Sequence, residues 1–310
     1  MTFFFQGIDL YIISVQDTEG IGMDQLVCYL NNAEPGRFVI GAEDCNLLIL
    51  GDGGRRPTGI SGLLLVVGCA GPIVPETLCA LRDKYKRDPF FSSLFVCGEK
   101  LAHLAGIPFI MAGYEKCDPT KIDAAFIDAM RFLVVDISSK KKENRRPVIL
   151  ESDAFAAYLH ALLGIRAVDA GTHKQKNKWV ADAFHVWSRC KLSSRLVKQD
   201  FDAIYQLGDR FAMIEVKRSS AKSLQDWTPY KDDMRNYDIQ NQFAKIIEAP
   251  FFTFHHADAA CDDATGVGCY QVLDVNPVDG SEWIDYKKTI VKAQEIPGIL
   301  KRQLESAEGA

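Results

Sequence analysis

The chain has 310 residues, of which 47% are hydrophobic and 25% are charged, and its formal net charge is −5 at pH 7. These proportions are those of ordinary globular proteins, and they exclude a collagen-like or largely disordered chain. The longest apolar run, residues 63–75, is too short to cross a bilayer, so we expect no contact with a membrane.

The first ten residues lack the basic region of a secretory signal peptide. The nine cysteines are scattered and are never spaced as C-x-x-C, which argues against a disulfide framework and against a zinc ribbon. These two features together predict a cytoplasmic protein with free thiols.

The N-terminal part, residues 1–118, alternates short apolar runs with turn-forming clusters, which predicts an α/β region. Strands are expected over residues 9–15, 37–40, 46–50, 62–67 and 91–96, and helices over residues 22–31, 74–86 and 98–105.

The basic stretch 138–147 is the most loop-like segment of the chain, and we place a domain boundary there. The predicted division is an N-terminal α/β region at 1–146, serving recognition, dimerisation or sensing, and a second domain at 147–310. Around the boundary, a helix is expected over residues 119–130, a strand over 131–137, and two helices over 152–163, with Ser152 as N-cap, and 177–190.

Residues 201–216 read as two strands around a tight turn at Gly208. Residues two apart on a strand share a face, so Glu215 and Lys217 point the same way. The hairpin also brings Asp202 near Glu215. We therefore expect two carboxylates and one ammonium group to converge at the edge of an apolar sheet.

Charges in such a place are costly unless they are paired or bind a metal. Two carboxylates with free oxygens suit a hard cation such as Mg²⁺, which keeps several of its waters. A nearby lysine can orient or deprotonate one of those waters. This combination can hydrolyse a phosphodiester. The alternative is a solvated hairpin with a Glu/Lys ladder, which the apolar neighbours of Glu215 disfavour.

Beyond the hairpin, Thr228 and Pro229 are typical of a helix start, and a helix is expected from there to residue 248, with Met234, Tyr237 and Ile246 facing inward. Strands are expected over residues 251–255 and 270–275, and a helix at the end of residues 280–304.

The pattern of an acid, a turn and an apolar strand ending in Glu215-Val216-Lys217 resembles the PD-(D/E)xK nuclease superfamily. Asp202 would be the first acid, thirteen residues before Glu215, although Phe201 stands where the family often has proline. The resemblance covers about residues 150–260. It implies a restriction-endonuclease-like core, with a central mixed sheet flanked by helices, to which the N-terminal α/β region is an addition.

The resemblance also implies the roles of the site residues. Asp202 and Glu215 would hold Mg²⁺ together with the Val216 carbonyl, with Mn²⁺ as a substitute ion, and Lys217 would position the attacking water. Accessory residues are expected on the helices to either side of the hairpin. For the first helix the candidates are Glu151 and Asp153, which a favourable charge at a helix N-terminus explains equally well. For the second helix they are Gln240, Lys231 and Gln242.

Charge is unevenly distributed along the chain. Residues 140–222 contain 17 Lys and Arg against nine Asp and Glu, a net charge of +8, which leaves −13 for the remainder. A local basic surface is sufficient for binding a phosphate backbone. The basic residues expected to contact DNA are Lys174, Lys176, Lys178, Arg218 and Lys222.

We therefore expect a metal-dependent endodeoxyribonuclease, of the type II restriction or anti-phage defence kind, that acts as a homodimer on DNA. Three alternatives stay open. These are a structure-specific repair or recombination nuclease, a nuclease gated by a small effector bound to residues 1–118, and a non-catalytic nucleic-acid-binding module.

Overall fold

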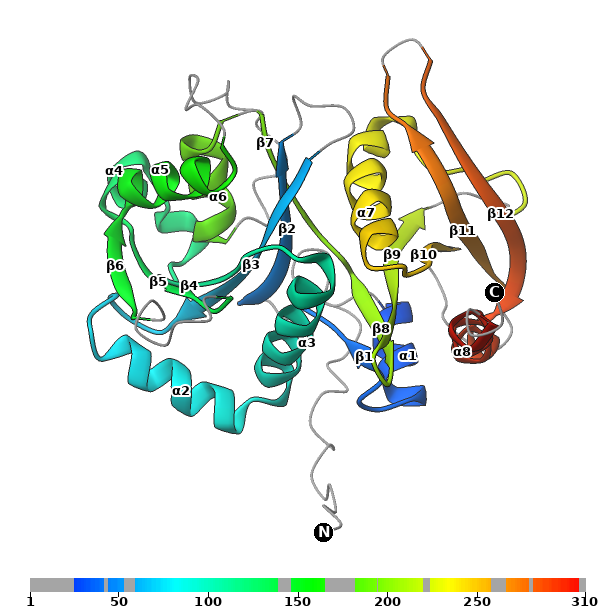
Figure 1. The fold of residues 1–310 in the computed structure, drawn as a ribbon, viewed down its shortest axis with the longest axis horizontal. Helices are drawn as coiled ribbons and strands as arrows, with labels where there is room; N and C mark the ends of the chain where they lie inside the picture. Colours follow the sequence, from blue (N-terminus) through cyan, green and yellow to red (C-terminus); the bar gives the residue numbers. More distant parts are fainter. Residues whose placement is uncertain are drawn as a thin grey trace.

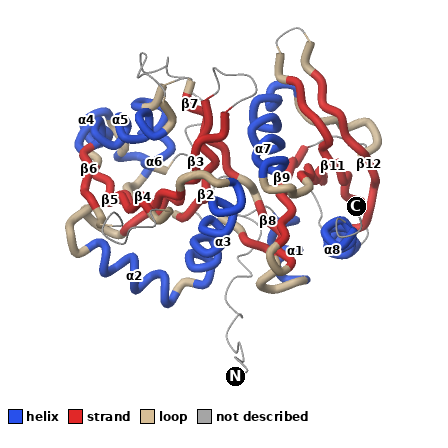
Figure 2. Tube along the Cα trace, viewed as in Figure 1, coloured by secondary structure: helices blue, strands red, loops and turns tan. Residues whose placement is uncertain are grey.

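The computed structural model describes residues 25–41, 44–52, 59–138, 146–164, 182–193, 195–219, 224–257, 266–278 and 281–306. The predicted α/β class is confirmed, because the chain forms two mixed six-stranded sheets with helices on their faces (Figures 1 and 2). No helix within these ranges is both long enough and apolar enough to cross a membrane.

The first sheet has the strand order β6-β5-β4-β3-β2-β7. Only β3 and β4 are parallel, because two helices join them and return the chain to the same end of the sheet. The strands are β2 (Cys45–Asp52), β3 (Gly59–Cys69), β4 (Phe109–Glu115), β5 (Arg131–Asp136), β6 (Val148–Glu151) and β7 (Leu196–Asp200).

The second sheet has the strand order β1-β8-β9-β10-β11-β12. Here β9 and β10 are parallel, and one helix joins them. The strands are β1 (Phe38–Val39), β8 (Ala203–Leu207), β9 (Arg210–Ser219), β10 (Phe251–Ala257), β11 (Gly266–Asn276) and β12 (Trp283–Lys292).

Helices cover both faces of both sheets. One face of the first sheet packs on α4 (Ala124–Ala129), α5 (Ser152–Leu162) and α6 (Ala183–Lys191). The other packs on α2 (Thr77–Arg87) and α3 (Pro89–Ala105). The outer face of the second sheet packs on α1 (Gln25–Ala33) and α8 (Ile296–Ser306). Short 3-10 turns lie at η1 (Pro119–Lys121), η3 (Lys231–Asp233) and η4 (Ala293–Glu295).

Helix α7 (Met234–Ile246) lies between the two sheets. It contacts β2, β3 and β7 of the first sheet and β9, β10 and β11 of the second. Its buried apolar residues belong to a core that both sheets share. A side chain on α7 can therefore reach groups from both sheets at once.

The sheets do not follow the predicted division of the chain at 146/147. Residues 148–200 supply β6, α5, α6 and β7, all of which join the first sheet, whereas α1 and β1 join the second. Which sheet a segment belongs to depends on pairing between strands that are far apart in the chain, and the local composition of the segment does not reveal that pairing.

The strand predicted at residues 91–96 is wrong, because these residues lie inside α3. Asp88 caps the helix by accepting from the N–H groups of Phe90 and Phe91, and Pro89 occupies its first turn. Gly106, with φ 65°, ends it. The apolar residues at 91–96 therefore follow a helical period, but over only six residues the same pattern also fits a strand.

Other predicted elements need smaller corrections. The helix expected from Pro229 begins only at Met234, because residues 227–230 have no regular structure and residues 231–233 form the 3-10 turn η3. Ile246 is 45% exposed rather than inward. Residue Glu151, not Ser152, occupies the N-cap position of α5, and the Ser152 hydroxyl instead accepts from the Trp187 indole N–H at 2.9 Å.

The helix expected over residues 119–130 is reduced to η1 and α4, and no strand was expected at β6, β7 or β12. The expected strand at 9–15 lies outside the described residues. The hairpin, the strand at β10 and the C-terminal helix are confirmed.

Candidate active site

The β8–β9 hairpin brings the three predicted residues together. Gly208 turns the chain with φ 65°, and Ala203 pairs with Ile214, which places Asp202 beside Glu215. The Val216 N–H donates to Asp202 Oδ2 at 2.6 Å. This bond fixes the first acid against the strand that carries the second.

The alternation of β9 sorts its side chains between two cores. Met213 packs into the core that contains α7, whereas Ile214 packs toward α1 and α8. Glu215 and Lys217 follow the period of Met213 and face α7. They contact each other, with Lys217 Nζ 2.9 Å from Glu215 Oε1.

Gln240 of α7 joins this cluster, as the sequence predicted among its alternatives. Its Nε2 donates to Glu215 Oε2 at 2.6 Å and to the Asp200 carbonyl at 2.8 Å. Gln240 is fully buried and Glu215 is only 6% exposed. The amide therefore ties the end of β7, in the first sheet, to the carboxylate on β9, in the second.

Two residues that sequence reasoning did not assign to the site hold Lys217. Asp233 Oδ2 lies 3.0 Å from Lys217 Nζ, and the ammonium lies 5.5 Å from the centre of the Tyr237 ring. The spacing of 233, 237 and 240 is that of one helix face, which is the signal that could have grouped them with Gln240.

The cluster holds two carboxylates in a poorly solvated place. Burial and the nearby charge of Glu215 raise the pKa of Asp202 well above its usual range. Burial also raises the pKa of Glu215, against the opposing effect of Lys217. Burial by itself lowers the pKa of Lys217, but Glu215, Tyr237 and Asp233 together outweigh this effect and the net shift of the pKa is upward. The charged forms of the two acids are therefore disfavoured, and an additional positive charge beside them would stabilise these forms.

The residues present fit a divalent cation. Asp202 and Glu215 offer hard oxygen ligands, and Gln240 Oε1 is buried without a hydrogen-bond partner, so a coordinated water could donate to it. Within the described ranges, no group of three or more His, Cys, Asp or Glu side chains is placed to hold a metal ion. The remaining ligands would be water and a backbone oxygen, a coordination typical of Mg²⁺.

The structure does not bring Glu151 to this cluster. It lies on β6, at the opposite edge of the first sheet from β7, and pairs with Arg131 at 3.1 Å. Asp153 pairs with Lys191 on the same side of the molecule. The geometry therefore supports the other interpretation of Glu151 and Asp153, which is that they are favourable negative charges at the N-terminus of α5.

Among the described residues, the other accessory candidates make no hydrogen bond or ion pair with the cluster. Gln242 donates to Asp238, one turn back on α7, at 2.7 Å, and Lys231 is exposed in η3. The backbone of Arg218 follows Lys217 on β9. Three of the predicted DNA contacts, Lys174, Lys176 and Lys178, lie outside the described residues, as does Lys222.

An aromatic cluster anchors the segment that leads to α7. The Trp227 ring stacks on His255 at 4.2 Å with an interplanar angle of 2°, and the Trp227 carbonyl accepts from the Tyr270 hydroxyl at 2.8 Å. Lys288 Nζ lies 3.2 Å from the same carbonyl. His255 pairs in register with Lys217 on the neighbouring strand, so this anchor adjoins the site.

We expect the stability of the protein to fall in mild acid through His255. Burial lowers the pKa of this fully buried histidine to about 4, whereas an unfolded histidine titrates near 6.5. The unfolded state therefore takes up a proton first, and the contribution present above pH 6.5 is lost as the pH falls toward 4. Urea unfolding of wild type and His255→Phe should show about 2 kcal/mol less pH dependence in the variant between pH 7 and 5. His103→Phe, at an exposed position on α3, is the matched control. An unchanged pH dependence in His255→Phe would contradict the assignment.

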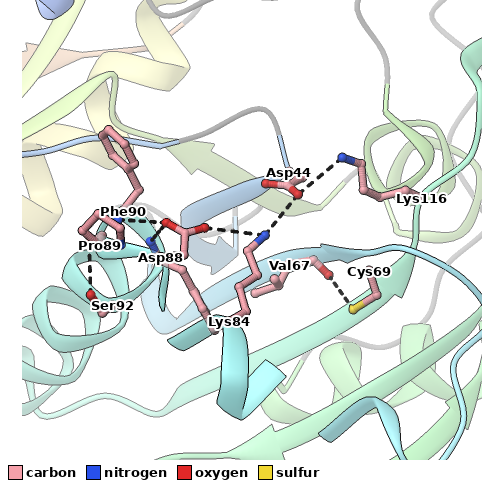
Figure 3. Close-up of polar contacts among 10 residues, drawn as sticks. Asp44, Val67, Cys69, Lys84, Asp88, Pro89, Phe90, Ser92 and Lys116 are labelled. Carbon is pink, nitrogen blue, oxygen red and sulfur yellow. Dashed lines mark hydrogen bonds and ion pairs between the residues drawn. The ribbon is translucent and has the colours of Figure 1, made fainter. Parts of the chain in front are cut away.

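A hollow of about 280 Å³ lies beyond the carboxyl ends of β3 and β4. Figure 3 shows the polar contacts of three residues that line it, Asp44, Lys84 and Lys116. Lys84 and Lys116 both reach the same oxygen of Asp44 there, at 3.1 and 3.4 Å. The thiol of Cys69 lies in its wall, and burial raises the pKa of this thiol to about 11. This thiol therefore stays protonated near neutral pH and is a poor nucleophile.

Comparisons with protein-family models, with curated proteins and with solved structures found no match. The case for a function therefore rests on the geometry of the cluster around Glu215 and on the sequence pattern that encodes it.

Proposed function

We propose that the protein is a Mg²⁺-dependent endonuclease that hydrolyses DNA phosphodiester bonds. The observation that carries the proposal is the convergence of Asp202, Glu215, Lys217 and Gln240 at the β8–β9 hairpin. This set suits metal-assisted hydrolysis of a phosphodiester, because it combines two buried carboxylates, a lysine and an amide oxygen that is buried without a hydrogen-bond partner.

Each side chain has a distinct role in the proposal. Asp202 and Glu215 hold the cation, which when bound supplies a Lewis acid and a more acidic water. Lys217 donates to a phosphate oxygen or to the attacking water and opposes the negative charge of the transition state. Gln240 keeps Glu215 in position through Nε2 and offers Oε1 as an acceptor for a water.

The order of elements around the site supports a restriction-endonuclease-like core. The hairpin β8–β9 is followed by α7 and then by β10, which lies parallel to β9. The second sheet is mixed and carries helices on both faces, as the resemblance implies. In this proposal the first sheet and its helices serve target recognition, dimerisation or sensing.

The expected substrate is duplex DNA, and the expected biological role is restriction or another defence against phage. In the proposal, phosphate contacts come from basic residues of the segment 140–222, which carries a net charge of +8 and includes Arg218 and Lys222. A palindromic target would favour a symmetric homodimer, because each copy then cuts one strand.

The test incubates the purified protein with plasmid and phage DNA in Mg²⁺, in Mn²⁺ and in EDTA. We expect cleavage with either ion and none in EDTA. Discrete fragments would identify a sequence-specific endonuclease, whereas a smear would favour a repair-type nuclease. Retained DNA binding without cleavage by the wild type in any of these conditions would favour the non-catalytic module instead.

The hollow beside Asp44 favours a second candidate function, which is a nuclease that is activated by a small effector. It lies within residues 44–116, in the part of the chain where such a sensor was expected. Cleavage that appears only after addition of a low-molecular-mass extract from phage-infected cells would support gating. Full cleavage by the protein alone would exclude it.

A further inference from the structure

The ammonium of Lys217 is shared between carboxylates from two different elements. Glu215 Oε1, two residues away on β9, lies 2.9 Å from Nζ, and Asp233 Oδ2, at the start of α7, lies 3.0 Å from it. The lysine side chain is 17% exposed, whereas Asp233 is 30% exposed at the outer side of the contact. The ammonium is therefore held from the sheet and from the helix at the same time.

Asp233 stands at the N-cap position of α7, where an aspartate side chain usually caps the helix. A capping side chain normally accepts from backbone N–H groups of the first turn. Its side chain makes no such capping bond. The carboxylate is instead directed to Lys217.

The segment that carries Asp233 is anchored on the strands that flank the site. The Trp227 carbonyl accepts from Tyr270 of β11 and from Lys288 of β12, and the Trp227 ring stacks on His255 of β10. The Tyr230 ring meets the Trp227 ring edge-on at 5.5 Å, and the Asp233 N–H donates back to the Tyr230 carbonyl at 3.1 Å. A continuous chain of contacts thus links the second sheet to Asp233.

We propose that Asp233 is a positioning residue for Lys217, holding its ammonium where the proposed cleavage reaction needs it. This inference rests on the proposed function, in which Lys217 is the catalytic lysine. Glu215 is engaged by Gln240 as well and is assigned to the cation, so Asp233 is the anion that remains dedicated to the lysine. Without it, the ammonium would keep the carboxylate of Glu215 as its ion-pair partner and the Tyr237 ring as its contact on α7.

The expected signature is a loss in turnover without a loss in DNA affinity. A reacting group displaced by about 1 Å can lower a rate on the order of 10²-fold. We therefore expect Asp233→Asn to lower kcat by about 10- to 100-fold, with KM for DNA little changed. Asp233→Glu keeps the charge and should recover part of the loss. The neighbouring Asp232→Asn is the matched control, since Asp232 is exposed in η3.

A second readout does not depend on cleavage. In protein labelled with ¹⁵N-lysine, an ammonium held between two carboxylates should give a sharp Nζ–Hζ signal, which the Lys217→Arg variant identifies by its absence. We expect this signal to broaden or shift in Asp233→Asn and to persist in Asp232→Asn. Tyr270→Phe, which removes one anchor of the segment, should cause a smaller change in the same direction.

The two proposals fail in different ways. If the wild type does not cleave DNA, the nuclease assignment is lost, and the Lys217 signal still decides whether Asp233 positions the lysine. If the wild type cleaves and Asp233→Asn keeps both its kcat and the Lys217 signal, the positioning role is wrong. A lower kcat with an unchanged Lys217 signal would likewise overturn it, because the effect would then arise elsewhere.

Discussion

Lys217→Ala, Glu215→Ala and Asp202→Ala will each reduce Mg²⁺-dependent DNA cleavage by about 10³-fold or more. The three side chains meet within one hairpin, and each is assigned a role that no neighbour can take over. In the proposed mechanism, removing either acid would leave the cation with one carboxylate, and removing the lysine would take away the positive charge that faces the transition state. Cleavage of supercoiled plasmid, followed by time-resolved electrophoresis, measures all three.

The variants should differ in what they retain. Asp202→Ala and Glu215→Ala are expected to lose metal binding, as measured by Mn²⁺ electron paramagnetic resonance, whereas Lys217→Ala is expected to keep it. DNA binding measured in EDTA by fluorescence anisotropy should change little in any of them, because the proposal assigns the phosphate contacts to the basic segment 140–222. This pattern separates the loss of chemistry from the loss of the fold.

Matched controls lie on β12. Asp285→Ala and Lys287→Ala each remove a charge of the same kind from an exposed position of the same sheet. Both should cleave at the wild-type rate, since exposed substitutions away from the site are close to neutral. Full cleavage by Asp202→Ala, Glu215→Ala or Lys217→Ala would falsify the assignment of the site.

The largest effect on stability is expected for Trp187→Ala. Trp187 is fully buried between the first sheet and α5, with its ring centre 4.6 Å from Phe132 and 5.1 Å from Phe155. The substitution leaves a large cavity and removes the donor to the Ser152 hydroxyl, which is itself buried. We expect the free energy of unfolding to fall by about 3–5 kcal/mol, or more if Ser152 stays unpaired.

Denaturant unfolding measures this effect, and Trp283→Ala is its matched control. Trp283 is 46% exposed on β12, so its removal should change the free energy of unfolding by about 0.5 kcal/mol or less. Equal losses in the two variants would contradict the packing of α6 on the first sheet. Because Trp187 lies in a different core from Glu215, the variant should keep its cleavage rate at temperatures where it remains folded.

The elements that were predicted well are those whose evidence is local. The alternation on both sides of Gly208 predicts the β8–β9 hairpin, and the two-residue period then places Glu215 and Lys217 on one face. Residues 91–96 show the limit of the same reasoning. Their apolar run also fits a strand, and only the caps at Asp88 and Gly106 mark it as helix.

The sequence by itself determined the α/β class, the hairpin and the three charged residues that the hairpin brings together, because each depends on neighbours in the chain. The tertiary structure decided what surrounds them. It placed Gln240 and Asp233 of the α7 region on the cluster and left Glu151 at the far edge of the first sheet. These positions depend on which strands pair and on a helix packed between two sheets, and such long-range contacts leave no periodic signal in the local sequence.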